Sequence, residues 1–309
     1  MTKALVFPGQ GSQIVGMGKE LYDSFAEAKH VFEEVDDALS KNLSKIIFEG
    51  PIEDLTLTEN TQPALMATSI AVMRVLEKQG GKSIGDIASY VAGHSLGEYS
   101  ALCAAGSVSL SDTAKLLKIR GISMQEAVPQ GQGAMAAIIG LSLEDVEKIA
   151  TVVDGVAEVA NDNSDGQVVI SGAKAAVEQA EAIAKDVGAK RFVILNVSAP
   201  FHSSLMQPAA DRMAEALASA EFVAPKVPLI ANVTADVVTE PQEIKDLLVK
   251  QVTGRVRWRE SVAKLNELGV EATIEVGAGK VLSGLTRRIV KEMSSVSIQN
   301  AADIEKYLG

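Results

Sequence analysis

The chain has 309 residues, 47% hydrophobic and 22% charged, which is typical of a globular protein with one or two domains around a large core. A net charge of -11 argues against a general nucleic-acid or anionic-membrane binder, and the single cysteine, Cys103, excludes an internal disulfide and any multi-cysteine metal site. No window approaches the roughly 20 apolar residues of a membrane span, and no leader-like pattern opens the sequence, so we expect a cytoplasmic protein.

The first predicted strand covers residues 4–7 and runs into a loop at residues 8–13 that contains two glycines and two glutamines. This loop lacks a nucleotide-binding pattern, because Ile14 stands where the third glycine of G-x-G-x-x-G belongs. It is therefore either a surface turn or a source of hydrogen-bond donors for a site. Helices are predicted over residues 21–39 and, with Pro63 in the first turn, over residues 63–78.

An apolar run at residues 87–92 predicts a buried strand that leads into Gly93-His94-Ser95-Leu96-Gly97. Small residues up to Ala105 predict a helix directly afterwards. A Gly-x-Ser-x-Gly sequence between a strand and a helix is the nucleophile elbow, where glycines allow a sharp turn that exposes the serine beside a helix N-terminus. Ser95 is therefore the candidate nucleophile.

The next helix is predicted over residues 111–127 and carries one unexpected charge. Arg120 lies three or four residues from Leu116, Leu117 and Met124, so it shares the apolar stripe of this helix. Buried arginines are rarely unpaired, which indicates a structural ion pair or a snorkelling side chain. The functional alternative is a bidentate clamp for a substrate carboxylate.

A second group of elements follows the break at residues 129–133. Strands are predicted over residues 134–139, 156–160, 167–171 and 191–197, helices over 142–152 and 173–187, and a turn over 161–166. This β-α-β-β-α-β order is ferredoxin-like. We predict an α/β fold: an α/β-hydrolase-like catalytic domain with a parallel sheet, built from residues 1–128 and 198–309, and an inserted ferredoxin-like domain at residues 129–197.

The final part of the chain alternates strands and helices again. The predicted helices cover residues 208–218, 241–250 and 280–293, and the predicted strands cover residues 227–233 and 271–276. Serine needs a base to become a nucleophile, and the chain offers three histidines. His30 lies on a charged helix and His94 points away from the elbow, which leaves His202, placed after the serine as in α/β hydrolases. No acid is clearly placed to orient His202, so a backbone carbonyl is the expected acceptor.

Several motifs in register resemble the malonyl-CoA:acyl carrier protein transacylases of bacterial type II fatty acid synthesis. The motifs extend over nearly the whole chain and are, in order, residues 7–13, 61–64, 93–98, 120–121, 133–135, 199–202 and 275–277.

The resemblance implies a role for each matching residue. Ser95 carries the malonyl group as an ester and His202 is the general base and then acid. Gln10 and the backbone N–H of Leu96 form the oxyanion hole, and Arg120 holds the malonate carboxylate. Two further residues follow from the same resemblance: the backbone carbonyl of Gln251 orients the histidine, and Phe201 is like malonyl-selective acyltransferases, although some bacterial transacylases carry serine there.

The resemblance also implies a ping-pong reaction that needs neither a metal nor a tightly bound cofactor. Its partners are malonyl-CoA and, transiently, acyl carrier protein, with no nucleic acid or membrane, and we expect a monomer. Because the carrier proteins of this family are acidic, a local positive rim is required on a chain of net charge -11. Two basic pairs are candidates, with a solvated face as the alternative: Lys190, Arg191, Arg287 and Arg288.

Two other functions fit parts of the pattern. The elbow alone is compatible with a serine hydrolase acting on esters or thioesters, although Arg120 and the missing triad acid argue against it. A non-catalytic carrier-protein-binding protein could keep the fold, but it would have no need for intact Ser95, His202 and Arg120.

Overall fold

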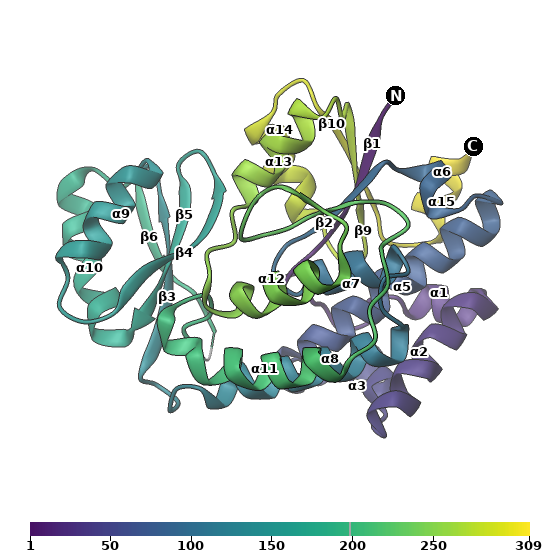
Figure 1. The fold of residues 1–309 in the computed structure, drawn as a ribbon, viewed down its shortest axis with the longest axis horizontal. Helices are drawn as coiled ribbons and strands as arrows, with labels where there is room; N and C mark the ends of the chain where they lie inside the picture. Colours follow the sequence, from purple (N-terminus) through teal and green to yellow (C-terminus); the bar gives the residue numbers. More distant parts are fainter. Residues whose placement is uncertain (198) are drawn as a thin grey trace.

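The computed structural model describes residues 1–197 and 199–309 and contains a larger and a smaller β-sheet (Figure 1). The larger sheet is six-stranded, in the order β10-β9-β1-β2-β7-β8, and only the β7–β8 pair at its edge is antiparallel. Its strands are β1 (Lys3–Phe7), β2 (Tyr90–Gly93), β7 (Leu229–Ile230), β8 (Val237–Val238), β9 (Ala272–Val276) and β10 (Ser294–Ile298).

Helices cover both faces of this sheet, as expected for a parallel sheet whose inner strands are largely apolar and buried. Along β1, Leu5 and Phe7 face a core shared with α2, α5, α7 and α8, whereas Ala4 and Val6 face α13 and α14. The helices of this part are α1 (Lys19–Ser24), α2 (Ala26–Leu39), α3 (Leu43–Glu49), α4 (Ile52–Thr56), α5 (Thr58–Gly80), α6 (Ile84–Ile87), α7 (Gly97–Ala104), α8 (Leu110–Glu126), α11 (Gln207–Ser219), α12 (Pro241–Thr253), α13 (Trp258–Glu267), α14 (Val281–Ile289) and α15 (Ala301–Leu308), with the 3-10 turn η1 (Ser204–Met206).

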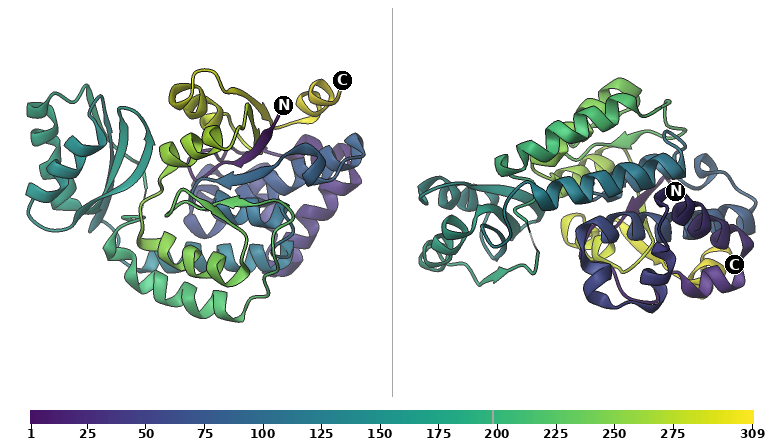
Figure 2. Two further views of the ribbon diagram at one scale, coloured as in Figure 1. Left: turned by 45° about the horizontal axis from the view of Figure 1, so that its top comes forward. Right: turned by 90° about the horizontal axis from the view of Figure 1, so that it is seen from below.

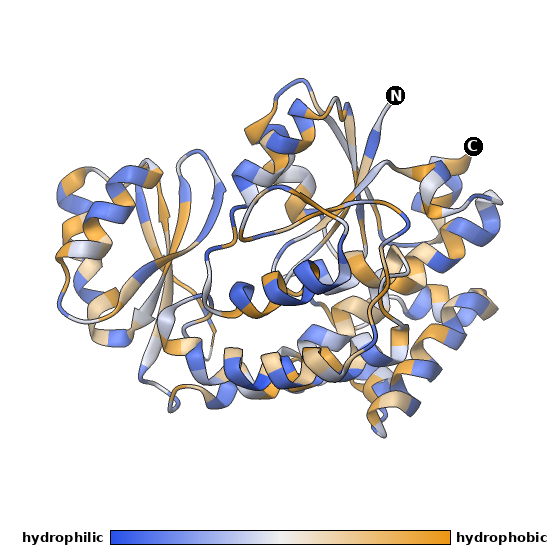
Figure 3. Cartoon of the chain, viewed as in Figure 1, coloured by the Kyte–Doolittle hydropathy of each residue, from blue (hydrophilic) through white to orange (hydrophobic). Residues whose placement is uncertain are grey.

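The smaller sheet stands to one side of the larger layer in both orientations shown (Figure 2). It is antiparallel, in the order β4-β5-β3-β6, and has its own hydrophobic core beneath two helices. Its elements are β3 (Gly133–Ile139), α9 (Leu143–Val152), β4 (Ala157–Ser164), β5 (Gln167–Ala173), α10 (Lys174–Val187) and β6 (Arg191–Ile194). Amphipathic helices such as α10 alternate between hydrophobic and hydrophilic residues along their length (Figure 3).

The α/β fold, with its parallel sheet and a ferredoxin-like βαββαβ unit, is confirmed. The division into a catalytic domain of residues 1–128 and 198–309 and an inserted domain of residues 129–197 stays a prediction. Ser198, at one of these boundaries, lies outside the described residues. None of the described helices is both long enough and apolar enough to cross a membrane.

Several predicted boundaries were wrong because tertiary contacts overrode local preference. Pro63 lies inside α5, which begins at Thr58, since the first turn of this helix is buried and the Thr61 hydroxyl bonds to the Leu55 carbonyl. The predicted helix over residues 21–39 is interrupted at Phe25, whose extended backbone lets its ring pack on the core. Ile87 ends a short helix with a Ser83 capping box, so the strand before the elbow starts only at Tyr90.

Residues 161–166 were predicted as a turn, yet β4 continues to Ser164. Pairing with β5 through two register shifts, together with side-chain partners outside the sheet, holds these polar residues extended. Elsewhere the predicted strands over residues 191–197 and 227–233 and the helix over 280–293 are shorter than expected. The short elements α3, α4, α13, α15, β8 and β10 were not predicted.

Candidate active site

The elbow between β2 and α7 is a tight turn around Ser95, and the backbone approaches at Gly93 and Gly97 are too close for any residue with a Cβ atom. Ser95 adopts the left-handed region, with φ of 52°. A Cβ on Gly93 would lie 1.9 Å from the Gly97 carbonyl, and one on Gly97 would lie 2.2 Å from the Phe7 carbonyl oxygen. The helix therefore approaches the sheet so closely that the serine is left at the tip of the turn.

His202 lies directly against the serine. Its Nε2 is 2.8 Å from Ser95 Oγ, and its Nδ1 lies 2.8 Å from the Gln251 carbonyl oxygen and 3.1 Å from that of Gly254. Because carbonyl oxygens only accept, Nδ1 carries the proton and Nε2 is free to accept from the serine hydroxyl. The pair is a dyad whose orienting acceptor is the main chain instead of an acid.

The protonation state of His202 suits a base. Burial, and then the nearby charge of Arg120, lower its pKa to about 3, against the opposing effect of the two carbonyl acceptors. The imidazole is therefore neutral at pH 7 and ready to take a proton.

Arg120 reaches the same point from α8 and is only 1% exposed. Its Nη2 donates to Ser95 Oγ at 3.1 Å and to Gln251 Oε1 at 3.0 Å, and its Nη1 donates to Gln62 Oε1 at 2.8 Å. Burial lowers the pKa of this guanidinium. Within the described residues it forms no ion pair, so of the two alternatives from the sequence, the structural ion pair is not observed.

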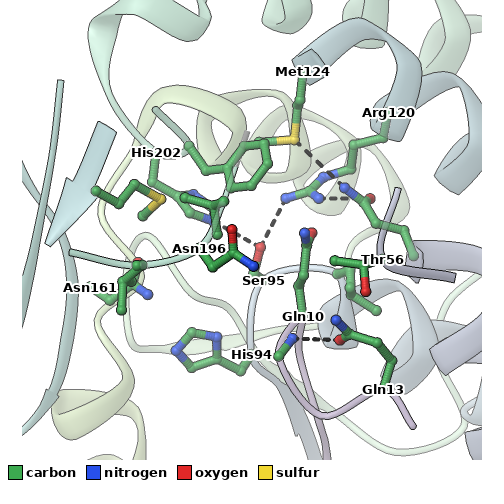
Figure 4. A pocket seen from close by; sticks show the side chains of 17 residues that line it. Gln10, Gln13, Thr56, His94, Ser95, Arg120, Met124, Asn161, Asn196 and His202 are labelled. Atoms are coloured by element: carbon green, nitrogen blue, oxygen red, sulfur yellow. Dashed lines mark hydrogen bonds between the residues drawn. The ribbon is translucent and has the colours of Figure 1, made fainter. Parts of the chain in front are cut away.

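These groups share a cavity of about 290 Å³ that lies between the two sheets (Figure 4). Gln10, Ser95, Leu96, Arg120, Phe201 and His202 all line it, whereas Gln251 does not line it but hydrogen-bonds to three of them: Ser95, Arg120 and His202. The Gln10 side chain points into the cavity toward Ser95 in Figure 4. The smaller sheet closes the other side through three segments: Met135, Asn161 and residues 195–197.

Sequence reasoning missed a buried polar network beneath the elbow. Asn232 accepts from the Ser95 N–H at 2.8 Å and donates to the Gly93 carbonyl at 2.7 Å, which holds the strained turn. Glu98 accepts from the Asn232 N–H and from Gln251 Nε2, and burial raises its pKa to about 7. Glu98 and Gln62 both stood inside recognised motifs, and Asn232 ended a predicted strand, but none had been assigned a role.

Other candidates lie outside the cavity or at its edge. His94 contacts Asn163 of β4 through Nε2 at 2.8 Å and packs on the Trp258 ring, so it ties the elbow to the smaller sheet. Cys103 is buried, and burial raises its thiol pKa to about 11. The four basic residues considered for carrier binding lie away from the serine, at Lys190, Arg191, Arg287 and Arg288.

The geometry brings together a serine hydroxyl, a histidine that can accept its proton and a buried guanidinium, which is the set of groups that acyl transfer through a serine requires. The family model of the acyl transferase domain matches residues 4–306. This chain belongs to that family.

Known relatives of this acyl transferase are similar over nearly their whole length. The malonyl CoA-acyl carrier protein transacylase of Bacillus subtilis (strain 168) is 48% identical over 98% of this chain and 95% of its own. The protein of the same name from Escherichia coli (strain K12) is 47% identical over 96% of this chain and 95% of its own.

Solved structures agree with this assignment. The acyl-carrier-protein-S-malonyltransferase from Bartonella henselae is 56% identical, with a TM-score of 0.97, and the match covers 100% of this chain and 98% of that one. A malonyl-transacylase in complex with its type II PKS acyl-carrier protein is 43% identical, with a TM-score of 0.96, covering 100% of this chain and 99% of that one.

Proposed function

We propose that this acyl transferase moves the malonyl group from malonyl-CoA to the phosphopantetheine thiol of acyl carrier protein, in fatty acid biosynthesis, through a malonyl ester on Ser95. The observation that carries the proposal is the buried Arg120 guanidinium, which has no counter-ion among the described residues and lies 3.1 Å from the nucleophilic oxygen. A guanidinium at that distance can form charge-assisted hydrogen bonds with an acyl group that ends in a carboxylate, as malonyl does.

In the first half-reaction, His202 Nε2 takes the Ser95 proton while the serine oxygen attacks the thioester carbonyl. The negative charge that develops on the carbonyl oxygen is stabilised by the Leu96 N–H and by Gln10, the electrostatic contribution that is usually largest in acyl transfer. The carbon–sulfur bond then breaks, and the protonated His202 returns its proton to the departing CoA thiolate.

In the second half-reaction, the carrier thiol gives its proton to His202 and attacks the malonyl ester. The carbon–oxygen bond to Ser95 breaks, and His202 reprotonates the serine. Arg120 holds the distal carboxylate through both halves, so the acyl group keeps one orientation. Water competes with the thiol, and the largely apolar lining from Met124, Met135 and Phe201 disfavours it.

One experiment separates transfer from hydrolysis and from mere binding. The protein is mixed with malonyl-CoA and followed by intact mass spectrometry, before and after addition of acyl carrier protein or buffer. We expect one malonyl group on Ser95 without carrier, its rapid movement to the carrier thiol, and slow loss to water. Equal loss to water and to carrier would indicate a hydrolase, and no ester at all would indicate a non-catalytic protein.

We also propose that the carrier docks on the basic cluster formed by Lys190, Arg191 and Arg288. Arg288 Nη1 donates to Gln167 Oε1 at 2.7 Å, and both Gln167 and Arg191 pair with Ile139 at one end of β3. Met135, four residues away on the same strand, lines the cavity, so the cluster lies about 13 Å from it along the strand. A long phosphopantetheine arm could therefore enter from this side.

Charge reversal tests the docking surface. Reversing these three residues to glutamate should raise the KM for carrier protein about 10-fold through lost steering, with acylation by malonyl-CoA unaffected. Arg287 is left intact because it donates to the Ser295 carbonyl, and Lys306→Glu, on exposed α15, is the matched control. An unchanged KM for the carrier would refute this surface.

The proposal includes a cytoplasmic monomer as the working form, as expected from the sequence. Light scattering coupled to size-exclusion chromatography at assay concentrations tests the monomer. A mass of two or more chains would overturn that part and leave the chemistry intact.

A further inference from the structure

In the described part of the chain, the residues that accept hydrogen bonds from Arg120 share one property that the proposed reaction does not by itself require: all of them are neutral. The guanidinium donates to two amide oxygens, on Gln62 and Gln251, and to the Ser95 hydroxyl. Buried arginines are ordinarily matched by a carboxylate, because leaving a charge uncompensated inside a protein is costly. Here the fold positions the cation with hydrogen bonds while leaving its charge unneutralised.

The nearest acid is held off by one of these amides. Gln251 accepts from Arg120 through Oε1 and donates to Glu98 Oε2 through Nε2, at 3.2 Å. The carboxyl group of Glu98 therefore lies on the far side of the Gln251 amide, where its remaining acceptor contact is the Asn232 N–H. The side-chain amide of Gln251 therefore separates the Glu98 carboxyl group from the Arg120 guanidinium.

Gln62 has fewer contacts than Gln251, the other glutamine that accepts a hydrogen bond from Arg120. It lies in the first turns of α5, is 1% exposed, and gives its oxygen to Arg120. Its Nε2 makes a long contact of 3.8 Å to Met124 Sδ and no shorter one to any residue that the structure describes. The position thus needs an acceptor oxygen but hardly needs the amide nitrogen, so glutamate would satisfy its hydrogen bonds as well as glutamine does.

We propose that Gln62 and Gln251 are specificity-determining positioning residues, whose neutrality keeps the Arg120 charge available to an acyl group that carries its own carboxylate. The inference rests on the proposed malonyl transfer. A carboxylate at position 62 would form an internal ion pair with Arg120, and the site would then favour uncharged acyl groups such as acetyl. The side chain at position 62 selects the charge of the substrate without needing to touch it.

The test is the Gln62→Glu variant, assayed for Ser95 acylation with malonyl-CoA and with acetyl-CoA. We expect the ratio of kcat/KM for malonyl to that for acetyl to fall about 100-fold, since a hydrogen bond to a charged partner is replaced by an internal one. The melting temperature should be no lower than that of the natural protein, because the buried cation gains a counter-charge.

Two control variants separate charge from other effects. Gln62→Met removes the acceptor but adds no charge, so its malonyl-to-acetyl ratio should stay within a few-fold of the natural value even if both rates fall. Gln242→Glu adds the same charge at an exposed position on α12, outside the cavity, and tests for a general effect of net charge.

The outcomes distinguish the two proposals. If the natural protein forms no malonyl ester, the proposed function fails. If it does, and Gln62→Glu keeps the natural preference, the inference about neutrality is overturned. The inference is also overturned if Gln62→Met loses the preference for malonyl as strongly as Gln62→Glu does. It is overturned as well if Gln62→Glu does not fold, because an uncompensated guanidinium should accept the carboxylate.

Discussion

Two arginines near the junction of the sheets show how differently one side chain can be used. Arg259 of α13 binds Asp162 of β4 through two nitrogens, with contacts of 2.8 to 3.1 Å, and Asp162 is only 1% exposed. These hydrogen bonds raise the pKa of Arg259, whereas burial lowers the pKa of Arg120. One arginine has its counter-ion within the chain, and the other has none among the described residues.

The difference indicates a structural role for the charge of Arg259 and, under the proposed function, a substrate-binding role for the charge of Arg120. Arg259 and Asp162 join β4 to the larger unit, next to the bridge between Asn161 and Val256, so their pairing stabilises the junction. Arg120 lines the cavity and has no counter-ion among the described residues; under the proposed function the substrate carboxylate supplies it. Arg120 is also the more deeply buried of the two, but the difference in role follows from the acceptors: neutral oxygens at Arg120 and a carboxylate at Arg259.

The largest effect is expected at Arg120. In Arg120→Met, malonyl acylation should fall about 1000-fold, since the transition state loses its charge-assisted contact, while some acetyl transfer remains. The free energy of unfolding should change little, because relief of the cost of burying a charge offsets the loss of the hydrogen bonds to the Gln62 and Gln251 oxygens. Acylation rates with both thioesters and a urea titration measure this, and retained malonyl activity would refute the clamp.

The opposite pattern is expected at Arg259. Arg259→Met leaves the Asp162 carboxylate buried without its cation, which should cost about 2 kcal/mol of stability, reduced from the fully buried case because Arg259 is 30% exposed. The malonyl-to-acetyl ratio should not change. Chemical denaturation measures the stability of this variant, and the malonyl and acetyl acylation assays measure its selectivity. A changed malonyl-to-acetyl ratio under conditions where the variant is fully folded would show that Arg259 also affects substrate selection.

The smallest effect concerns the pH dependence of acylation. With a pKa of about 3 instead of its ordinary 6.5, His202 stays neutral as pH falls from 7 to 5, so any loss of acylation over that range should come from Glu98, whose pKa is about 7, and not from the base. Arg120 contributes to this lowering, so in Arg120→Met the acid limb of acetyl transfer should move to higher pH. A pH–rate profile measures the shift, with Arg259→Met as the control that should show none.

The sequence singled out Arg120 as a candidate site residue, but it did not predict the partners of either arginine. Arg120 stood out because a charge on an apolar stripe demands a reason, and the elbow was visible because its glycines and serine are adjacent in the chain. The two glutamines that accept from Arg120 lie in α5 and α12, far from it in sequence, so no local pattern could reveal that it has no counter-ion among the described residues. Asp162 was read as part of a turn because Asn, Asp and Ser favour turns locally, whereas its partner Arg259 lies in a helix that was not predicted at all.

The most direct test of this account is a crystal structure of the malonyl-enzyme, trapped on Ser95 in the absence of carrier protein. We expect the malonyl carboxylate within hydrogen-bonding distance of the Arg120 guanidinium, with Gln62 and Gln251 still bound to it, and the ester carbonyl oxygen directed at the Leu96 N–H. A carboxylate that points to solvent or pairs with another cation, leaving Arg120 bound only to its amides, would contradict the account.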